Sequence, residues 1–274
     1  MPGSVGADRQ IACRRCGYNL RESPGYMELQ RNETPVHWKV RQRMMDAAEG
    51  IRFLNLSLTV IGPQGASWLG KVLERCGSLE VLNLSGTQLK CAGVETIVES
   101  LSGCSKLAEL NLRDNRIEPD GVHELAAKLS LCASLQQLDL SCNKIKDTGS
   151  MLLAEKLPKF ASLEDLNLSY NGIGYMGSFR VSRILDKCPR LGKLNLSNNS
   201  LGDTGIFFFP FAMKEKCTSL TRLDLSNNNT SEHREKILTQ NVLGYYPNLD
   251  AQDLVLGIRR AVNCVTSAQT VASN

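Results

Sequence analysis

The sequence predicts an α/β solenoid, in which a parallel sheet forms a concave face and helices cover a convex face. The main observation is the pattern Leu-x-x-Leu-x-Leu, which recurs along most of the chain with a spacing of 28 residues five times and then 29. Self-similarity at such a fixed period is the signature of a repeat architecture. The first positions of the seven copies are Ile51, Leu79, Leu107, Leu135, Leu163, Leu191 and Leu220.

Each repeat divides into a strand half and a helix half. Leucines alternate in the first half, as at Leu82 and Leu84, which indicates a strand with one buried face. The second half starts at a glycine and has apolar residues four and eight positions later, as at Gly93, Ile97 and Leu101. This spacing places the two apolar residues on one face of a helix. Since one repeat alone cannot bury both halves, we expect stacked neighbours to form a single domain over residues 51–248.

Two further columns, each at one fixed position of the repeat, support this stacking. Asparagine follows the strand in five repeats, where its amide can donate to and accept from backbone groups left free at the strand end. Cysteine recurs three residues before the next strand leucine and is expected to act as a small buried hydrophobe. The two columns are Asn115, Asn143, Asn171, Asn199 and Asn228, and Cys76, Cys104, Cys132, Cys188 and Cys217.

The stretch Leu163-Glu-Asp-Leu-Asn-Leu-Ser-Tyr-Asn171-Gly-Ile173, followed by Gly177, resembles the ribonuclease-inhibitor class of leucine-rich repeats. The other copies share this frame over about residues 51–256. Ribonuclease inhibitor, Ran GTPase-activating proteins, tropomodulins and the arrays of NOD-like receptors all have this pattern. Because the activities of these proteins differ, the resemblance implies a fold and a class of function, not one activity.

The segments outside the array are expected to serve as its ends. Residues 1–34 are interpreted as a mobile leader and 35–50 as a capping helix over the first repeat. Residues 249–264 are interpreted as a degenerate repeat with a C-terminal cap, and 265–274 as a loose tail.

The ends also bear on location. Extracellular leucine-rich arrays resemble one another in having clustered cysteine caps at both ends, whereas Cys264 stands alone here. This difference, with one reduced thiol per repeat, favours an intracellular, cytoplasmic protein. Arg9, Arg14 and Arg15 accompany a single acid, Asp8, in the first twenty residues, so import into an organelle also stays open.

Composition and motifs give little support for other function classes. The net charge of +4 is small and diffuse, which argues against a nucleic-acid binder. No segment approaches the roughly 18 continuous apolar residues of a membrane span. We find no phosphate-binding or nucleophile motif, so no catalytic residue, cofactor or small-molecule substrate is predicted. The pair Cys13 and Cys16 has metal-like spacing but lacks the four ligands that zinc needs. We interpret it as two free thiols, and an incomplete or shared metal site is the alternative.

The strand side chains that point away from the core are the expected partner-binding residues. Along the column next to the first strand leucine, their character changes from apolar through acidic to basic, which a partner could distinguish. Anchors of interfaces are usually Trp, Tyr and Arg, which are few here. The concave-face candidates are Phe53, Glu109, Arg113, Asp139, Asp165, Tyr170, Lys193, Arg222 and Asp224.

One repeat departs from the pattern on the convex side. Its helix contains Ile206-Phe-Phe-Phe-Pro-Phe211, in which Phe209 takes the core position and Phe207, Phe208 and Phe211 fall off that face. Pro210 removes a helix donor and is expected to distort the turn. The three outlying aromatics either form an exposed contact site or turn inward against the next repeat.

Together these features predict a non-enzymatic interaction module or scaffold that binds protein partners through its repeat surface. Two alternatives remain. One is a regulator of a small GTPase resembling Ran GTPase-activating proteins, and the other is a structural subunit of a ciliary, cytoskeletal or organelle assembly.

Overall fold

The computed structural model describes residues 9–12, 19–30, 38–130, 132–183, 185–213, 219–233 and 254–255. The strands are β1 (Arg9–Ala12), β2 (Asn19–Ser23), β3 (Tyr26–Gln30), β4 (Phe53–Asn55), β5 (Val81–Asn83), β6 (Glu109–Asn111), β7 (Gln137–Asp139), β8 (Asp165–Asn167), β9 (Lys193–Asn195), β10 (Arg222–Asp224) and β11 (Leu254–Val255). The α-helices are α1 (Trp38–Ala47), α2 (Gly62–Leu73), α3 (Lys90–Ser100), α4 (Pro119–Leu129), α5 (Lys146–Lys156), α6 (Tyr175–Ser182) and α7 (Gly202–Met213). Short 3-10 turns follow several of these helices.

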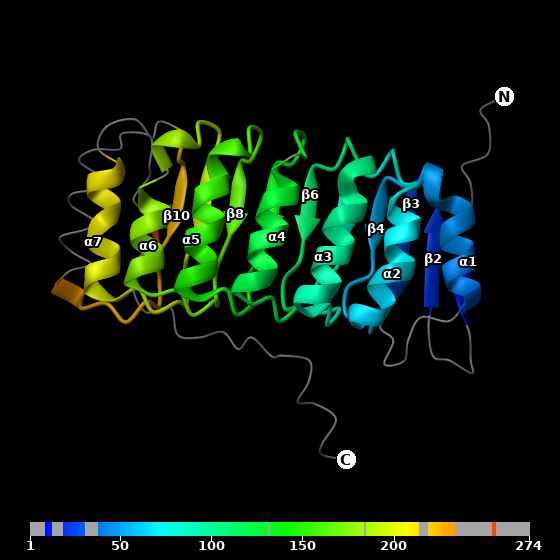
Figure 1. Ribbon diagram of the computed structural model, residues 1–274, viewed down its shortest axis with the longest axis horizontal. Coiled ribbons are helices and arrows are strands. Elements are labelled where there is room, and N and C mark those ends of the chain that lie inside the picture. Colours follow the sequence, from blue (N-terminus) through cyan, green and yellow to red (C-terminus); the bar gives the residue numbers. More distant parts are fainter. Residues whose placement is uncertain are drawn as a thin grey trace, which may run out of the picture.

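All of these strands belong to one open sheet whose spatial order is their order in the chain. From β3 to β11 every pairing is parallel, and neighbouring repeats pair residues one repeat apart, as Leu110 pairs with Leu138. Helices α2 to α7 stand side by side over one face of this sheet (Figure 1). The structure therefore confirms the α/β solenoid predicted from the repeat.

The core lies between the sheet and the helices. The middle leucine of each strand is almost fully buried, and so is the apolar residue four positions after each repeat glycine, such as Leu125 and Leu153. Leu138 of β7 is 1% exposed and Leu153 of α5 is 0% exposed. At about 25 cal/mol per Å² of apolar area, burial of such leucines is the dominant stabilising contribution.

The asparagine column links successive repeats by hydrogen bonds. Asn143 donates through Nδ2 to the carbonyl oxygens of Leu112, at 3.0 Å, and Leu140, at 2.9 Å. Its Oδ1 accepts from the backbone N–H groups of Asn115 and Ile117, both at 2.9 Å. Related bonds recur at Asn115, Asn171, Asn199 and Asn228. This buried amide thus satisfies strand-end groups of two repeats, as the sequence predicts.

Neighbouring helices approach closely at the repeat glycine. A Cβ on Gly149 of α5 would lie 2.8 Å from Ile145 Cγ2 and 3.2 Å from the Cα of Pro119 in α4. Both separations are shorter than ordinary carbon contacts. The glycine is therefore required by helix–helix packing.

One carboxylate caps the helix of the following repeat. Asp147, in the first turn of α5, accepts hydrogen bonds through Oδ1 from the backbone N–H groups of Gly174, at 2.6 Å, and Gly177, at 2.9 Å. These two donors belong to the start of α6, whose own cap residue supplies no side-chain bond. Asp147 thus provides the anionic partner that a helix N-terminus favours.

The N-terminal end of the array differs from the expectation. Residues 1–34 were expected to be a mobile leader, but residues 19–30 form a hairpin of β2 and β3. Strand β3 then pairs in parallel with β4. Leu20, Met27 and Leu29 are each 1% exposed. The expectation is wrong for this stretch because these alternating apolar residues extend the core beyond the first repeat.

Helix α1 packs beside this hairpin, and its apolar residues Val40 and Met44 are buried. At the other end, Pro210 lies within α7, so the helix continues through the residue that was expected to distort it. Most of the proposed C-terminal cap and the whole 265–274 tail lie outside the described residues.

Candidate functional site: the concave sheet face

The open face of the sheet presents its side chains in two columns set by strand register. Lateral pairing fixes the first column through β4 to β10 as Phe53, Val81, Glu109, Gln137, Asp165, Lys193 and Arg222. The second column through the same strands is Asn55, Asn83, Asn111, Asp139, Asn167, Asn195 and Asp224. Seven of the nine predicted concave residues therefore lie on two adjacent lines.

The hairpin lengthens both columns by one residue, which sequence reasoning missed. Tyr26 pairs with Phe53, and Glu28 pairs with Asn55. The Tyr26 hydroxyl donates to Glu28 Oε2 at 3.2 Å, while Asn55 Nδ2 donates to Glu28 Oε1 at 3.3 Å. Burial, followed by the charge of Glu28, raises the pKa of Tyr26 above its ordinary value. In the sequence, the alternation of polar Glu28 and amphipathic Tyr26 with apolar Met27 is the pattern that could have indicated this strand.

The N-terminal end of the face is aromatic and structurally supported. The Arg52 guanidinium lies 5.4 Å from the centroid of the Phe53 ring. The same guanidinium donates to both carboxylate oxygens of Glu80, at 2.9 and 2.8 Å, from one repeat to the next. This contact lowers the pKa of Glu80. Tyr26, Phe53 and Val81 thus form a largely apolar end backed by a bidentate ion pair.

The centre of the face is hollow and acidic. A depression of about 290 Å³ is lined by residues of β5 to β8, including Glu109, Asp139 and Asp165. Asp139 Oδ1 accepts the backbone N–H of Ser141 at 2.8 Å, which holds this carboxylate in place. Glu109 is exposed. The centre therefore concentrates negative charge in a recessed region.

The C-terminal end carries the basic residues. Lys193 Nζ lies 3.6 Å from Asp165 Oδ2, so this pair marks the boundary between the acidic centre and the basic end. Arg222 is exposed on the neighbouring strand. Asp224 accepts hydrogen bonds from the N–H of Ser226, at 3.0 Å, and from its hydroxyl, at 2.7 Å. The carboxylate of Asp224 therefore stabilises the turn that follows its strand.

Arg113 and Tyr170 lie just beyond the strands. Arg113 Nη1 donates to Ser141 Oγ of the next repeat at 2.9 Å. Tyr170 has a backbone φ of 57°, and its N–H donates to the carbonyl oxygen of Ser197 at 3.1 Å. This left-handed position recurs in every repeat and favours glycine, asparagine or aspartate. Tyr170 shares this position with Gly86, Asp114, Asn198 and Asn227, and also with Leu58 and Cys142, which like the tyrosine are not favoured there.

The convex candidates have different environments. Phe207 is 44% exposed, and Phe208 is half-buried against Phe179 of α6, with ring centroids 4.7 Å apart. Phe209 is fully buried, as expected. The side chain of Phe211 is not among those that the structure describes. The aromatic run thus supplies both an exposed surface and the core.

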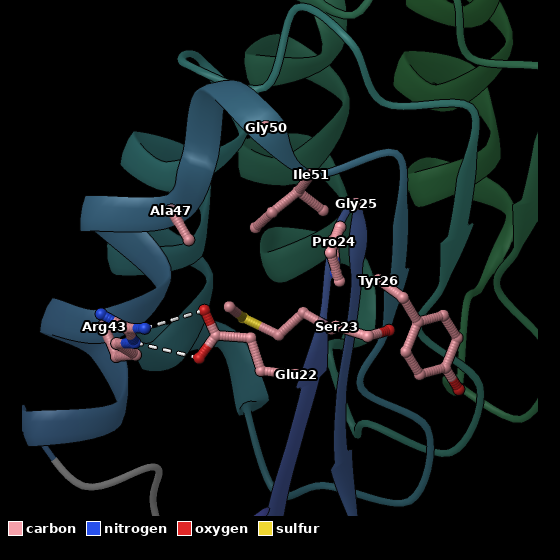
Figure 2. Close-up of a pocket in the computed structure, with 10 residues that line it drawn as sticks. Glu22, Ser23, Pro24, Gly25, Tyr26, Arg43, Ala47, Gly50 and Ile51 are labelled. Carbon is pink, nitrogen blue, oxygen red and sulfur yellow. Dashed lines mark hydrogen bonds and ion pairs between the residues drawn. The ribbon is translucent and has the colours of Figure 1, made fainter. Parts of the chain in front are cut away.

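A second cavity, of about 380 Å³, lies between the hairpin and α1. Figure 2 shows Arg43 of α1 reaching Glu22 of β2, with Nε and Nη2 donating to the two carboxylate oxygens at 3.0 Å each. These two charged groups satisfy one another. We therefore interpret this cavity as part of the packing between the hairpin and α1 at the N-terminal end, and not as a ligand site.

The cysteine column is reduced where it is described. Cys76 and Cys104 are buried and free, and burial raises their pKa to about 11 and about 12. No cluster of three or more potential metal ligands occurs within the described segments. The metal-like pair Cys13 and Cys16 lies outside them. Cys76, Cys104 and Cys188 therefore belong to the core, and Cys132 packs against it.

A family model described as leucine-rich repeat matches residues 103–126, 131–154, 161–177, 187–209 and 216–229. The matches fall on five consecutive repeats that share the parallel sheet. These five matched segments are therefore leucine-rich repeats within the α/β solenoid.

Two solved structures that match this chain are distant in sequence. Actin-binding site 2 of leiomodin-1 is 17% identical, with a TM-score of 0.41, and the match covers 50% of this chain and 77% of that one. The receptor kinase HAESA ectodomain from Arabidopsis, solved with an N-terminally extended IDA peptide hormone, is 18% identical with a TM-score of 0.41. That match covers 68% of this chain and 27% of the receptor chain. A comparison with curated proteins gave no match. Over the described residues, no helix is long and apolar enough to cross a membrane.

Proposed function

We propose that this protein is a non-catalytic interaction module whose concave sheet face binds a protein partner. The observation that carries this proposal is the sequence of three zones along one register column. Tyr26 and Phe53 form an aromatic end, Glu109 an acidic centre, and Lys193 with Arg222 a basic end. Such an ordered arrangement favours one orientation of a bound partner.

The dimensions of the face suit a protein or peptide. Strands lie about 4.8 Å apart, so β3 to β10 extend over roughly 34 Å. The aromatic end offers anchor side chains of the kind enriched in interface hot spots. The acidic depression over β5 to β8 supplies the charge that excludes acidic partners from the centre. We therefore expect the partner to place basic groups against Glu109 and its neighbours.

A charge change on the face tests this proposal. Glu109 and Gln137 are both exposed, and the variant Glu109→Lys with Gln137→Lys places positive charge in the centre. Affinity purification with quantitative mass spectrometry should identify a partner whose recovery falls about tenfold or more with this variant. The control Glu95→Lys with Ser67→Lys makes the same net change at exposed helical positions and should retain the partner. A partner lost equally from both variants, or from neither, contradicts binding by the concave centre.

The described residues carry no observation that favours a GTPase regulator or an assembly subunit over this module. Each remains the alternative that the sequence suggested.

A further inference from the structure

One outward-facing position of the helices changes character along the array. Residues one repeat apart share a position on successive helices, and their side chains are polar in the early repeats and apolar in the late ones. From α2 to α7 this position holds Ser67, Glu95, His123, Met151, Phe179 and Phe207. The change begins at α5. Because the core does not need these positions in the first three helices, their apolar character in α5 to α7 requires another explanation.

A groove lies on the helical side where this change occurs. It has a volume of about 750 Å³ and involves α5, α6 and the turn after α6. Its apolar lining includes Met151 and Leu152 from α5 and Phe179 from α6. These helices are neighbours in Figure 1. The groove is therefore a recess between two adjacent helices that has apolar side chains in its lining.

Aromatic side chains continue the apolar surface from this groove onto α7. Phe208 packs edge-to-face on Phe179, and Phe207 lies 6.5 Å from Phe208 between ring centroids. Phe207 is 44% exposed, and near the start of α6 Tyr175 and Met176 are 51% and 47% exposed. Exposed contiguous apolar groups of this kind mark interaction sites.

The rim of the groove is basic. Arg180, Arg183 and Lys187 line it and are exposed. No ion pair joins any of these three to a carboxylate of the described residues, while the Arg183 guanidinium lies 5.7 Å from the Phe179 ring centroid. The groove also contains Glu155, whose carboxylate is paired with Lys156 at 3.0 Å. The charge available to a ligand is therefore positive.

We propose that this groove binds an acidic amphipathic helix of a protein partner. The apolar face of such a helix would cover Met151, Phe179 and Phe207, and acidic residues along its edge would meet Arg180 and Lys187. This is the helix-in-groove mode, in which residues at i, i+3, i+4 and i+7 enter an apolar groove. An anionic membrane surface shares the charge preference, but the recess between α5 and α6 suits a rod-shaped ligand better than a flat one. The site is separate from the concave face and goes beyond the function proposed above.

A synthetic peptide tests this proposal directly. The probe is a fluorescein-labelled 18-residue helix with leucine on one face and glutamate on the other, measured by fluorescence anisotropy against the full chain. A matched peptide has lysine in place of each glutamate. We expect the acidic peptide to bind at least about tenfold more tightly than the basic one, and its affinity to fall as salt is raised.

Variants of the chain locate the binding. Phe207→Ser, and separately Arg180→Glu with Lys187→Glu, should each weaken the acidic peptide about fivefold or more. The matched control is Lys71→Glu with Lys128→Glu, at exposed positions of α2 and α4, and it should leave the affinity unchanged. The concave variant Glu109→Lys with Gln137→Lys should also leave it unchanged, which separates this site from the function proposed above. Thermal unfolding followed by circular dichroism verifies that each variant is folded.

Three results would each overturn the proposal. The first is equal affinity for the acidic and basic peptides. The second is an effect of the control variant as large as that of the groove variants. The third is binding to vesicles containing phosphatidylserine, lost with Arg180→Glu and Lys187→Glu, in the absence of peptide binding, which would assign the surface to a membrane.

Discussion

The amide oxygen of Asn143 accepts a hydrogen bond from the backbone N–H of Asn115, which lies one repeat earlier, at 2.9 Å. The same oxygen also accepts from the N–H of Ile117. Asn143 is 7% exposed, so water does not replace it readily if it is removed. One side chain thereby completes the turn of another repeat.

Replacing Asn143 by alanine should destabilise the chain substantially. The change leaves buried donors and acceptors unsatisfied, each of which costs about 1–3 kcal/mol. We expect the urea midpoint of Asn143→Ala to fall clearly below that of the unmodified chain. Glu95→Ala, at an exposed position of α3, is the control and should shift stability by less than about 0.5 kcal/mol. Equal midpoints for the two variants would refute the role of the asparagine column.

The cap from Asp147 predicts a smaller loss. Asp147→Ala removes the acceptor of the Gly174 and Gly177 N–H groups and should cost about 1 kcal/mol. Amide hydrogen exchange should accelerate at the start of α6 more than within α5. The adjacent exposed Thr148→Ala serves as the control. Faster exchange confined to α5 would show that Asp147 acts only within its own helix.

Gly149 should not tolerate a methyl group. Alanine normally favours a helix by about 1 kcal/mol over glycine. Here the added Cβ would meet Ile145 and Pro119, and overpacking of this kind costs about 1–3 kcal/mol. Gly149→Ala should therefore lower the melting temperature. Gly77→Ala, whose Cβ meets nothing within 4 Å, should not. A higher melting temperature for Gly149→Ala would mean that the helices can separate at little cost.

The buried thiols predict a loss of stability at alkaline pH. Burial raises the pKa of Cys76 to about 11 and of Cys104 to about 12 from an ordinary value near 9. The native chain therefore holds these protons at a pH where the unfolded chain releases them. Their contribution is fully present below pH 9 and is lost as the pH rises toward 11 to 12. The urea midpoint should fall between pH 8 and pH 10.5.

The variant Cys76→Ala with Cys104→Ala isolates this effect. Its midpoint at pH 8 should be lower because two buried side chains are smaller, but the fall between the two pH values should be reduced. An unchanged pH dependence would exclude the thiols as its source.

The repeat was predictable because its chemistry is local and regular. Alternating leucines and the glycine spacing define strand and helix in each copy, and the fixed period then determines which residues become neighbours. Asn143 could be placed in the turn for the same reason. The concave columns followed from the strand register, so Phe53 and Arg222 could be placed on that face without a structure, while their role in binding stays a prediction.

Other features depend on relationships that no single repeat contains. The hairpin joins the sheet through β4, and its short apolar alternation at Leu20, Met27 and Leu29 lies outside the period. The cap of α6 by Asp147 depends on how closely two successive repeats pack, which the sequence of one repeat does not show. The groove beside Phe179 likewise depends on how α5 and α6 pack. Sequence reasoning identified Phe207 and Phe208, but it could not show which of them is exposed.

The hydrogen bonds of the asparagine column reach only the adjoining repeat, and their donors and acceptors are nearly all backbone groups common to every copy. If one 28-residue repeat is removed, the two repeats that become neighbours can therefore form the same asparagine hydrogen bonds. The length of this molecule is thus modular, and whole units can be gained or lost over evolution without a redesign of the junction.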